Sequence, residues 1–154
     1  MHKYEAQVSW RRDGAPFVDN RFSRGHEWSF DGGVRVAASA SPTVVPAPCC
    51  VIEAVDPEEA LVASSSSCHM LWFLSLAAKR GFVVETYRDE AYGVMEKNPA
   101  GKLAFSRITL RPSIRFLAEK APSSEELNAL HHRAHEECFI ANSLKCEIVV
   151  EAGS

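Results

Sequence analysis

Two cysteines stand where thiol chemistry could be carried out. Cys68 lies in SSSSCHM, in the middle of a long apolar segment, and Cys138 lies in AHEECFIANS, near the end of a second segment with helical periodicity. The thiolate is the reactive form of cysteine, so each thiol is a candidate nucleophile or redox centre. A lone cysteine in an apolar helix is more often a small buried side chain. What these thiols do therefore depends on the segments that carry them.

The segment from Asp56 to Gly81 predicts one long helix. Asp56 suits the N-cap, Pro57 suits the first helical position, and Glu59 completes a capping box, while Gly81 provides the stop. Its many apolar residues indicate a helix covered on most sides by protein. Residues 64–67 are four serines, small enough to let a second helix cross there. The apolar run is expected to be too short, and too polar at its centre, for a membrane span.

A second helix is expected to begin at Ser123 or Ser124. Glu126 lies three residues after Ser123, as a capping box requires. Residues on one helical face then include Leu127, Leu130, Ala134 and Cys138. The second thiol is therefore expected on the same stripe as the apolar side chains of its helix.

The remaining segments favour β-structure. Residues 4–10 alternate apolar and polar side chains, as a half-buried strand does, and residues 22–36 can form a hairpin around a Gly-Gly turn. We therefore predict an α+β fold with a largely antiparallel sheet. A single domain over residues 1–154 would comprise a β-meander at 1–38, a proline-rich loop at 39–55, and a helical and β remainder at 56–151.

Composition limits the classes of protein that the chain can belong to. With 154 residues and 46% hydrophobic residues, the chain can bury one core. A formal charge of −3 gives no reason to expect a nucleic acid or an anionic membrane as a partner. Five cysteines, an odd number, do not indicate a secreted disulfide framework. With no targeting signal at the N-terminus, we expect a cytoplasmic protein.

Several motifs together resemble a known family. The stretch DPEE precedes the small-residue run into Cys68, and much later His-x-x-Ala-His-x-x-Cys-Phe-Ile-Ala-Asn-Ser surrounds Cys138. These motifs, in this order and on the expected helices, resemble the OsmC/Ohr family of thiol-dependent peroxidases. The resemblance extends from about residue 57 to residue 143 and is clearest at its two ends.

The resemblance implies an OsmC-like fold with a long central helix, assembled as an intertwined homodimer with active sites at the interface. It implies reduction of organic hydroperoxides, with Cys68 as the attacking thiol and Cys138 as the thiol that resolves its sulfenic acid into a disulfide. Glu58, which follows a proline, would be the carboxylate of the site. No bound metal or organic cofactor is implied, but an external dithiol must return the disulfide to thiols.

Such a site needs a cation to favour the thiolate, because a free cysteine has a pKa near ~8.5. The helix N-terminus cannot serve, since Cys68 lies ~18 Å beyond Asp56 and the helix dipole acts within one turn. The family uses an arginine held by the glutamate. Arg24, in RFSRGHE, is our first choice for this arginine, and Arg12 and Arg21 are the alternatives.

Helix length also bears on assembly. Glu58 and Cys68 would lie ~15 Å apart along one helix, too far for one guanidinium to contact both. If both serve one site, they come from different chains. Two long helices packed antiparallel about a dyad, crossing near the serines, would bring each glutamate toward the cysteine of the partner.

Two rival hypotheses remain open at this stage. His131, His135 and Cys138 lie on one side of the second predicted helix and could bind a metal or sense redox state. Cys49 and Cys50 could join a relay, although adjacent cysteines in a proline-rich loop are usually incidental. The second rival is a non-catalytic protein of the same fold that binds a small apolar ligand.

Overall fold

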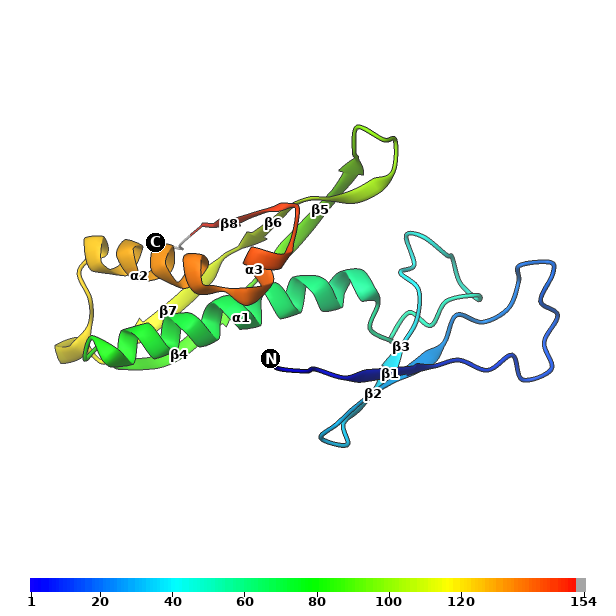
Figure 1. The fold of residues 1–154 in the computed structure, drawn as a ribbon, viewed down its shortest axis with the longest axis horizontal. Helices are drawn as coiled ribbons and strands as arrows, with labels where there is room; N and C mark the ends of the chain where they lie inside the picture. Colours follow the sequence, from blue (N-terminus) through cyan, green and yellow to red (C-terminus); the bar gives the residue numbers. More distant parts are fainter. Residues whose placement is uncertain (152–154) are drawn as a thin grey trace. The chain divides into compact units, whose positions relative to one another are not determined.

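The computed structural model describes residues 1–151, which form two compact units (Figure 1). The first unit is Met1–Ala60, and the second begins at Leu61. Each unit is described by itself, because their relative positions are not determined. The single domain expected from the sequence stays a prediction. The mixture of antiparallel sheets and a long helix confirms the α+β class.

The first unit contains a three-stranded antiparallel sheet. Its strands are β1 (Ala6–Ser9), β2 (His26–Phe30) and β3 (Arg35–Ala38), in the order β1-β2-β3. The predicted hairpin joins β2 to β3, where Gly33 takes a φ of 85° that glycine adopts without steric cost. The N-terminal strand was expected to be half-buried, and this is wrong: all four residues of β1 are exposed.

The proline-rich segment after β3 contains no regular strand, as predicted. It returns to the sheet at one point, where Ala38 and Val55 form an isolated parallel bridge. The buried Ser39 hydroxyl accepts from the Val51 amide (3.0 Å) and so holds the loop against the end of β3. A few local hydrogen bonds thus replace the ladder that prolines exclude.

The long helix α1 (Pro57–Lys79) begins in the last residues of the first unit and continues through the second. The capping box is formed as predicted: the Glu59 amide donates to Asp56 Oδ1 (2.7 Å), and the Asp56 amide donates to Glu59 Oε2 (3.3 Å). After Lys79 the chain turns at Gly81, whose φ is 80°. The start and stop signals in the sequence therefore set both ends of α1.

Only one stripe of α1 is buried, and the prediction of a helix covered on most sides by protein is wrong for this chain. The buried residues recur at intervals of four: Ser65, His69, Phe73 and Ala77. Leu71, on another face, is 61% exposed. The sequence pattern suggested fuller coverage because apolar residues occur all around α1, whereas the chain itself covers one side.

By length and composition alone, α1 could cross a membrane, since its best 18-residue window has a mean hydropathy of 1.3. The expectation that this run is too short and too polar for a span is therefore wrong by that measure. Core helices of soluble proteins meet the same criterion, so the finding does not assign a membrane role.

The second unit contains two sheets. β4 (Val84–Asp89) pairs antiparallel with β7 (Pro112–Phe116). In the other sheet, β6 (Leu103–Leu110) lies between β5 (Tyr92–Lys97), which it pairs antiparallel, and β8 (Glu147–Val150), which it pairs parallel. The sheets are thus largely antiparallel, with a parallel pairing that brings the last strand beside β6.

Two helices follow β7 and the short 3-10 turn η1 (Ala118–Lys120). α2 (Ser124–Glu137) has the predicted capping box, in which the Glu126 amide donates to Ser123 Oγ and the Ser123 amide donates to Glu126 Oε2. α3 (Phe139–Ser143) follows directly. α2 packs beside α1 through a cluster of buried residues that also contacts β4 and β7: Phe73, Ala77, Leu130 and Ala134.

A second apolar cluster lies between the β5-β6-β8 sheet and the part of α1 around Leu61 and Val62. Its buried members are Ile108, Leu110 and Ile148, and Val62 and Phe105 pack against them. Gly93 on β5 faces this cluster. A Cβ at Gly93 would lie 2.3 Å from Phe105 Cε1 and 3.0 Å from Val62 Cγ2, so no larger residue fits without movement.

We expect Gly93→Ala to lower the free energy of unfolding by ~1–3 kcal/mol, because overpacking outweighs the gain from replacing a strand glycine. Urea denaturation measures this change. The matched control is Gly32→Ala, since a Cβ at Gly32 meets no atom within 4 Å and the variant should keep nearly wild-type stability. Equal stability of the two variants would contradict the close packing of Gly93.

Candidate active site

The structure brings the two predicted thiols together. Cys68 lies near the middle of α1 and is half-buried, whereas Cys138 lies at the junction of α2 and α3 and is only 1% exposed. Both are free thiols, and Cys68 is near enough to Cys138 to raise the pKa of its thiol. Two thiols seventy positions apart in the sequence are thus neighbours in the fold, and they differ in their exposure to solvent.

Burial sets the electrostatics of Cys138. Desolvation, with a smaller contribution from the neighbouring Cys68, raises the pKa of its thiol to about 11. The Ala141 amide donates to Cys138 Sγ (3.4 Å) and acts in the opposite direction without overcoming burial. Cys138 is therefore a protonated thiol at neutral pH, and Cys68 is the more accessible member of the pair.

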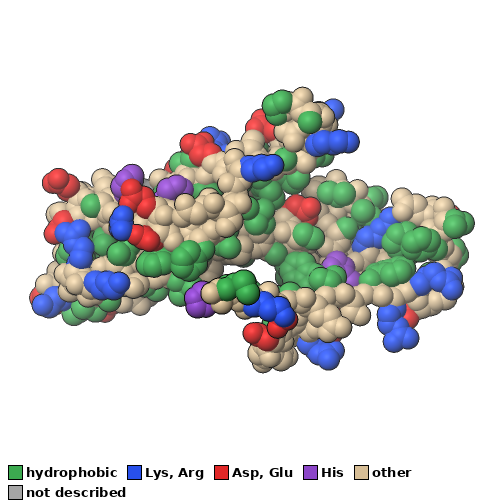
Figure 2. Space-filling view, in the orientation of Figure 1, with side chains coloured by type: hydrophobic (Ala, Val, Ile, Leu, Met, Phe, Trp, Pro, Cys, Tyr) green, Lys and Arg blue, Asp and Glu red, His purple; other side chains and the backbone are tan. Residues whose placement is uncertain are grey.

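Apolar side chains lie around the thiol pair. Trp72, one turn after Cys68, packs edge-on against Phe139, with ring centroids 5.5 Å apart. Phe139 is 65% exposed, and Figure 2 shows hydrophobic side chains at the surface over the middle of α1. The surroundings of the pair thus favour contact with an apolar molecule over a small charged one.

A buried pair of imidazoles lies next along α1. His69 Nε2 and His131 Nδ1 are 3.1 Å apart, the rings stack at 5.4 Å, and the side chains are 1% and 6% exposed. The pKa of each is lowered to about 4, mainly by desolvation; His131 and His135 contribute to the lowering for His69, while Asp89 opposes it for His131. Both rings are therefore neutral at pH 7.

Asp89, at the end of β4, joins α1 to the sheets. It accepts from Ser66 Oγ (2.5 Å) and from the Arg111 amide (2.6 Å). Its charge and, more strongly, burial raise the pKa of Tyr87. Neither the pairing of His69 with His131 nor the contacts of Asp89 were expected from the sequence. The spacing of His69 between Ser65 and Phe73 could have placed it on the buried stripe.

The structure does not assemble the metal site that the histidines and Cys138 suggested. His131 is turned toward His69, and His132, at the surface, pairs with Glu136. Throughout residues 1–151, no group of three or more His, Cys, Asp or Glu side chains is arranged to hold a metal ion. His131 and His132 are engaged in these contacts instead.

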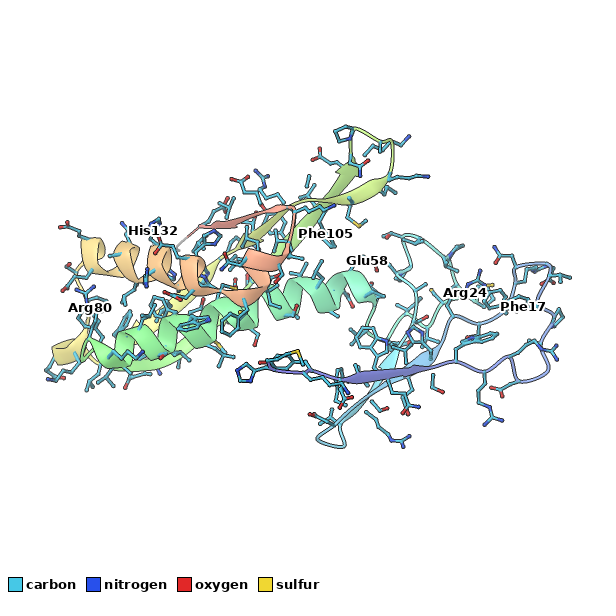
Figure 3. The ribbon with its side chains drawn as sticks, in the orientation of Figure 1. Phe17, Arg24, Glu58, Arg80, Phe105 and His132 are labelled. Carbon is cyan, nitrogen blue, oxygen red and sulfur yellow. The ribbon has the colours of Figure 1, made fainter. Side chains whose placement is uncertain are left out.

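The carboxylate and the arginines lie in the first unit. Arg24 is half-buried; its guanidinium donates to the Asn20 carbonyl, Asn20 Oδ1 and the Phe22 carbonyl, and stacks on the Phe22 ring at 3.9 Å. Glu58 projects from the first turn of α1 (Figure 3). Within the described residues 1–151, no ion pair joins Arg24 to Glu58.

The alternative arginines are exposed. Arg12 donates to the Ala15 carbonyl (2.8 Å). The Arg21 carbonyl accepts from Cys49 Sγ (3.4 Å), so Cys49 is engaged locally, and Cys50 is buried beside it. The positions of the two units relative to one another are not determined, so the roles of Glu58 and of these arginines beside Cys68 stay predictions.

A pair of thiols on facing helices, in an α+β fold with a long helix, defines a class of dithiol protein, and comparison with known proteins identifies the family. The sequence profile of the OsmC-like protein family matches residues 52–153. The chain therefore belongs to the OsmC-like family. No curated protein matches the chain.

Solved structures agree with this assignment. An OsmC-like protein of unknown function from Vibrio cholerae is 50% identical, with a TM-score of 0.97 over 99% of this chain and 100% of the other. An organic hydroperoxide resistance protein OsmC from Legionella pneumophila is 14% identical (TM-score 0.69; 99% and 96% covered). The organic hydroperoxide resistance protein OhrB of Bacillus subtilis is 18% identical (TM-score 0.69; 97% and 98% covered). The last two show the shared fold alone.

The buried imidazoles predict how stability depends on pH. Unfolded histidines bind protons near ~6.5, whereas folded His69 and His131 bind them only near about 4. The unfolded state therefore holds more protons between these values, and the free energy of unfolding should fall as pH falls from 6.5 toward 4, by up to ~1.4 kcal/mol per pH unit for each histidine.

Urea denaturation at pH 7, 6 and 5 measures this dependence. His131→Asn removes one titrating group and should reduce the slope by about one proton. His132→Asn is the matched control, because His132 is at the surface of the same helix and its loss should leave the slope nearly unchanged. An unaltered slope in His131→Asn would show that His131 is not buried in its neutral form.

Proposed function

We propose that this protein is a thiol peroxidase that reduces organic hydroperoxides with Cys68 and Cys138. The observation that carries the proposal is the pairing of two free thiols of unequal burial, one on α1 and one at the end of α2. An accessible thiol suits attack on an incoming molecule. A buried neighbour suits the later step, because it is held in contact, is shielded from competing oxidants while it is protonated, and gives up its proton only as hydroxide leaves the sulfenic acid as water.

The reaction would proceed in two balanced steps. The Cys68 thiolate attacks the terminal peroxide oxygen, an S–O bond forms, the O–O bond breaks, and the alkoxide leaves and takes a proton to become an alcohol. The Cys138 sulfur then attacks the Cys68 sulfenic acid, and the disulfide forms with loss of water. Two thiols are oxidised and one peroxide is reduced. An external dithiol then reduces the disulfide by exchange.

The substrate class follows from the surroundings of the thiols. The exposed Phe139 directly follows Cys138 and packs against Trp72, so apolar surface lies beside the thiol pair. An alkyl or aryl hydroperoxide would bury apolar area there, which hydrogen peroxide cannot do. The names of the Legionella and Bacillus structures fit this substrate class, although the proposal rests on the side chains of this chain.

The proposal includes a homodimer in which the site draws on both chains. Glu58 and Cys68 lie ten residues apart on one continuous helix, ~15 Å by helical rise. One arginine cannot contact both, so Glu58 of each chain would hold the activating arginine for the partner copy. Exposed apolar residues on α1, among them Leu71, are available for such an interface. Arg24 is our first choice for this arginine.

Thiol counting and disulfide mapping test the proposed reaction. One equivalent of an organic hydroperoxide should consume two thiols per chain and produce a Cys68–Cys138 disulfide, detected by mass spectrometry of peptides. Cys68→Ser should abolish peroxide consumption. Cys138→Ser should react once and accumulate the Cys68 sulfenic acid, which a dimedone probe would capture.

The control for this experiment is Cys146→Ser, because Cys146 packs against the second apolar cluster and takes no part in the thiol pair. It should consume peroxide at the wild-type rate. Peroxide consumption that survives Cys68→Ser, or a disulfide that involves Cys49 or Cys50, would refute the assignment.

The choice of arginine can be tested by comparing three substitutions. Arg24→Gln should lower the second-order rate constant for peroxide reduction by ~10²–10³, as loss of a single stabilising charge typically does, while Arg12→Gln and Arg21→Gln should change it little. Arg24 also holds its own loop through Asn20 and Phe22, so each variant needs a folding check by circular dichroism. A large loss confined to Arg12→Gln or Arg21→Gln would transfer the role to that residue.

A further inference from the structure

α1 and α2 run side by side in opposite directions (Figure 1), and within the described residues three further contacts accompany the apolar cluster between them. Cys68 meets Cys138 at one end, and the Arg80 guanidinium, just beyond α1, donates to Glu126 Oε1 (3.3 Å) at the other. Between them lies the bond from His69 to His131. His69 directly follows Cys68, and His131 precedes Cys138 by seven residues, or about two helical turns.

Among these contacts, the hydrogen bond between the two imidazoles is both buried and directional, so it restricts the alignment of the helices most. The Arg80 pair is about half exposed and contributes little to alignment. The apolar cluster around Phe73 attracts the helices without direction and would tolerate small shifts along the axis. A hydrogen bond between two ring nitrogens in the core has one geometry, and a slip would leave both nitrogens buried without a partner.

The outer ring nitrogens make this requirement stricter. His69 Nδ1 and His131 Nε2 are already buried with no hydrogen-bond partner among the described residues. Each ring therefore has a single satisfied nitrogen, the one that bonds the other ring. Phe73 stacks on His131, with centroids 4.6 Å apart, and fixes the plane of that ring. Losing the one satisfied contact would place four unpaired nitrogens in the core.

We propose that the hydrogen bond between His69 and His131 is a positioning element that fixes the register of α1 against α2 and so holds Cys138 against Cys68. His69 and His131 do not touch the substrate and act only through the placement of the two sulfur atoms. The inference rests on the proposed function in that it takes these two thiols as the redox pair.

The consequence is measurable as a redox equilibrium. Glutathione disulfide oxidises the pair by two exchange steps: the two thiols lose their protons and two electrons, one intramolecular disulfide forms, and two molecules of glutathione are released. The equilibrium constant increases with the effective concentration of one thiol at the other. A loosened register lowers that concentration and makes the disulfide easier to reduce.

The experiment compares folded variants of the full chain in glutathione redox buffers at pH 7. The fraction of Cys68–Cys138 disulfide is read by alkylation and peptide mass spectrometry. His131→Leu removes the bond and should lower the equilibrium constant at least tenfold. His131→Asn places an amide near the position of Nδ1 and should restore it to within about threefold of wild type.

Two further proteins complete the design. His132→Leu alters the neighbouring surface residue and should leave the constant unchanged. The double variant His69→Leu/His131→Leu removes every ring nitrogen and keeps an apolar core, so it should fold even if His131→Leu alone does not. It should show the same tenfold fall, since packing remains but the directional bond is gone.

A wild-type equilibrium constant in the folded double variant would overturn the inference, as would a failure of His131→Asn to restore the constant of a folded His131→Leu. The exchange uses no peroxide. A protein that leaves organic hydroperoxide intact would refute the proposed peroxidase activity, whereas the register inference depends only on the exchange constant.

Discussion

The packing of one stripe of α1 against α2 is the constraint on which the second unit depends. Residues recurring every four positions along α1 meet a face of α2 that ends in Cys138, so one helix contact both closes the core and places the thiols. The stripe is mixed in character, since Phe73 and Ala77 supply apolar area while Ser65 and His69 supply polar groups. Ser65 Oγ donates to the Leu61 carbonyl within the same helix (2.8 Å), whereas the His69 ring bonds to His131 of α2. Apolar burial therefore favours association, and the polar pair selects one alignment from those that burial alone would allow.

The same burial gives the two thiols different properties. Cys138 occupies the junction of α2 and α3, where the chain leaves the helical conformation and is enclosed by neighbouring elements. Cys68 lies along the continuous α1 and remains partly open to solvent. Since removal from water disfavours the charged form, the pKa of the enclosed thiol rises. The asymmetry needed for an attacking and a resolving cysteine thus follows from where each residue lies in its element.

Local signals made much of this fold predictable. The capping boxes at Asp56 and at Ser123 each involve residues three positions apart, so the starts of α1 and α2 could be found in the sequence alone. The turn at Gly33 is equally local. The hydrogen bond from His69 to His131 joins residues 62 positions apart, and the parallel pairing of β6 with β8 joins residues about forty apart. No local pattern in these segments indicates which distant segment each one contacts. Coverage of α1 was overestimated for a related reason, because hydrophobicity shows that a face avoids water and does not show what covers it.

Charge pairing separates the arginines of the first unit into two groups. In the first unit Arg11 pairs with Asp13 and Arg35 pairs with Glu27, so the positive charge of each is offset by a carboxylate. The other three arginines of the first unit, Arg12, Arg21 and Arg24, have no ion-pair partner among the residues that the structure describes. Arg24 differs from the others because neutral oxygens and the Phe22 ring hold its guanidinium. Carbonyl oxygens orient a guanidinium without neutralising it, so its full charge stays available to a thiolate or to Glu58. The proposed peroxidase needs a fixed but unneutralised cation beside its thiolate, and these contacts favour Arg24 over two more exposed arginines for that role.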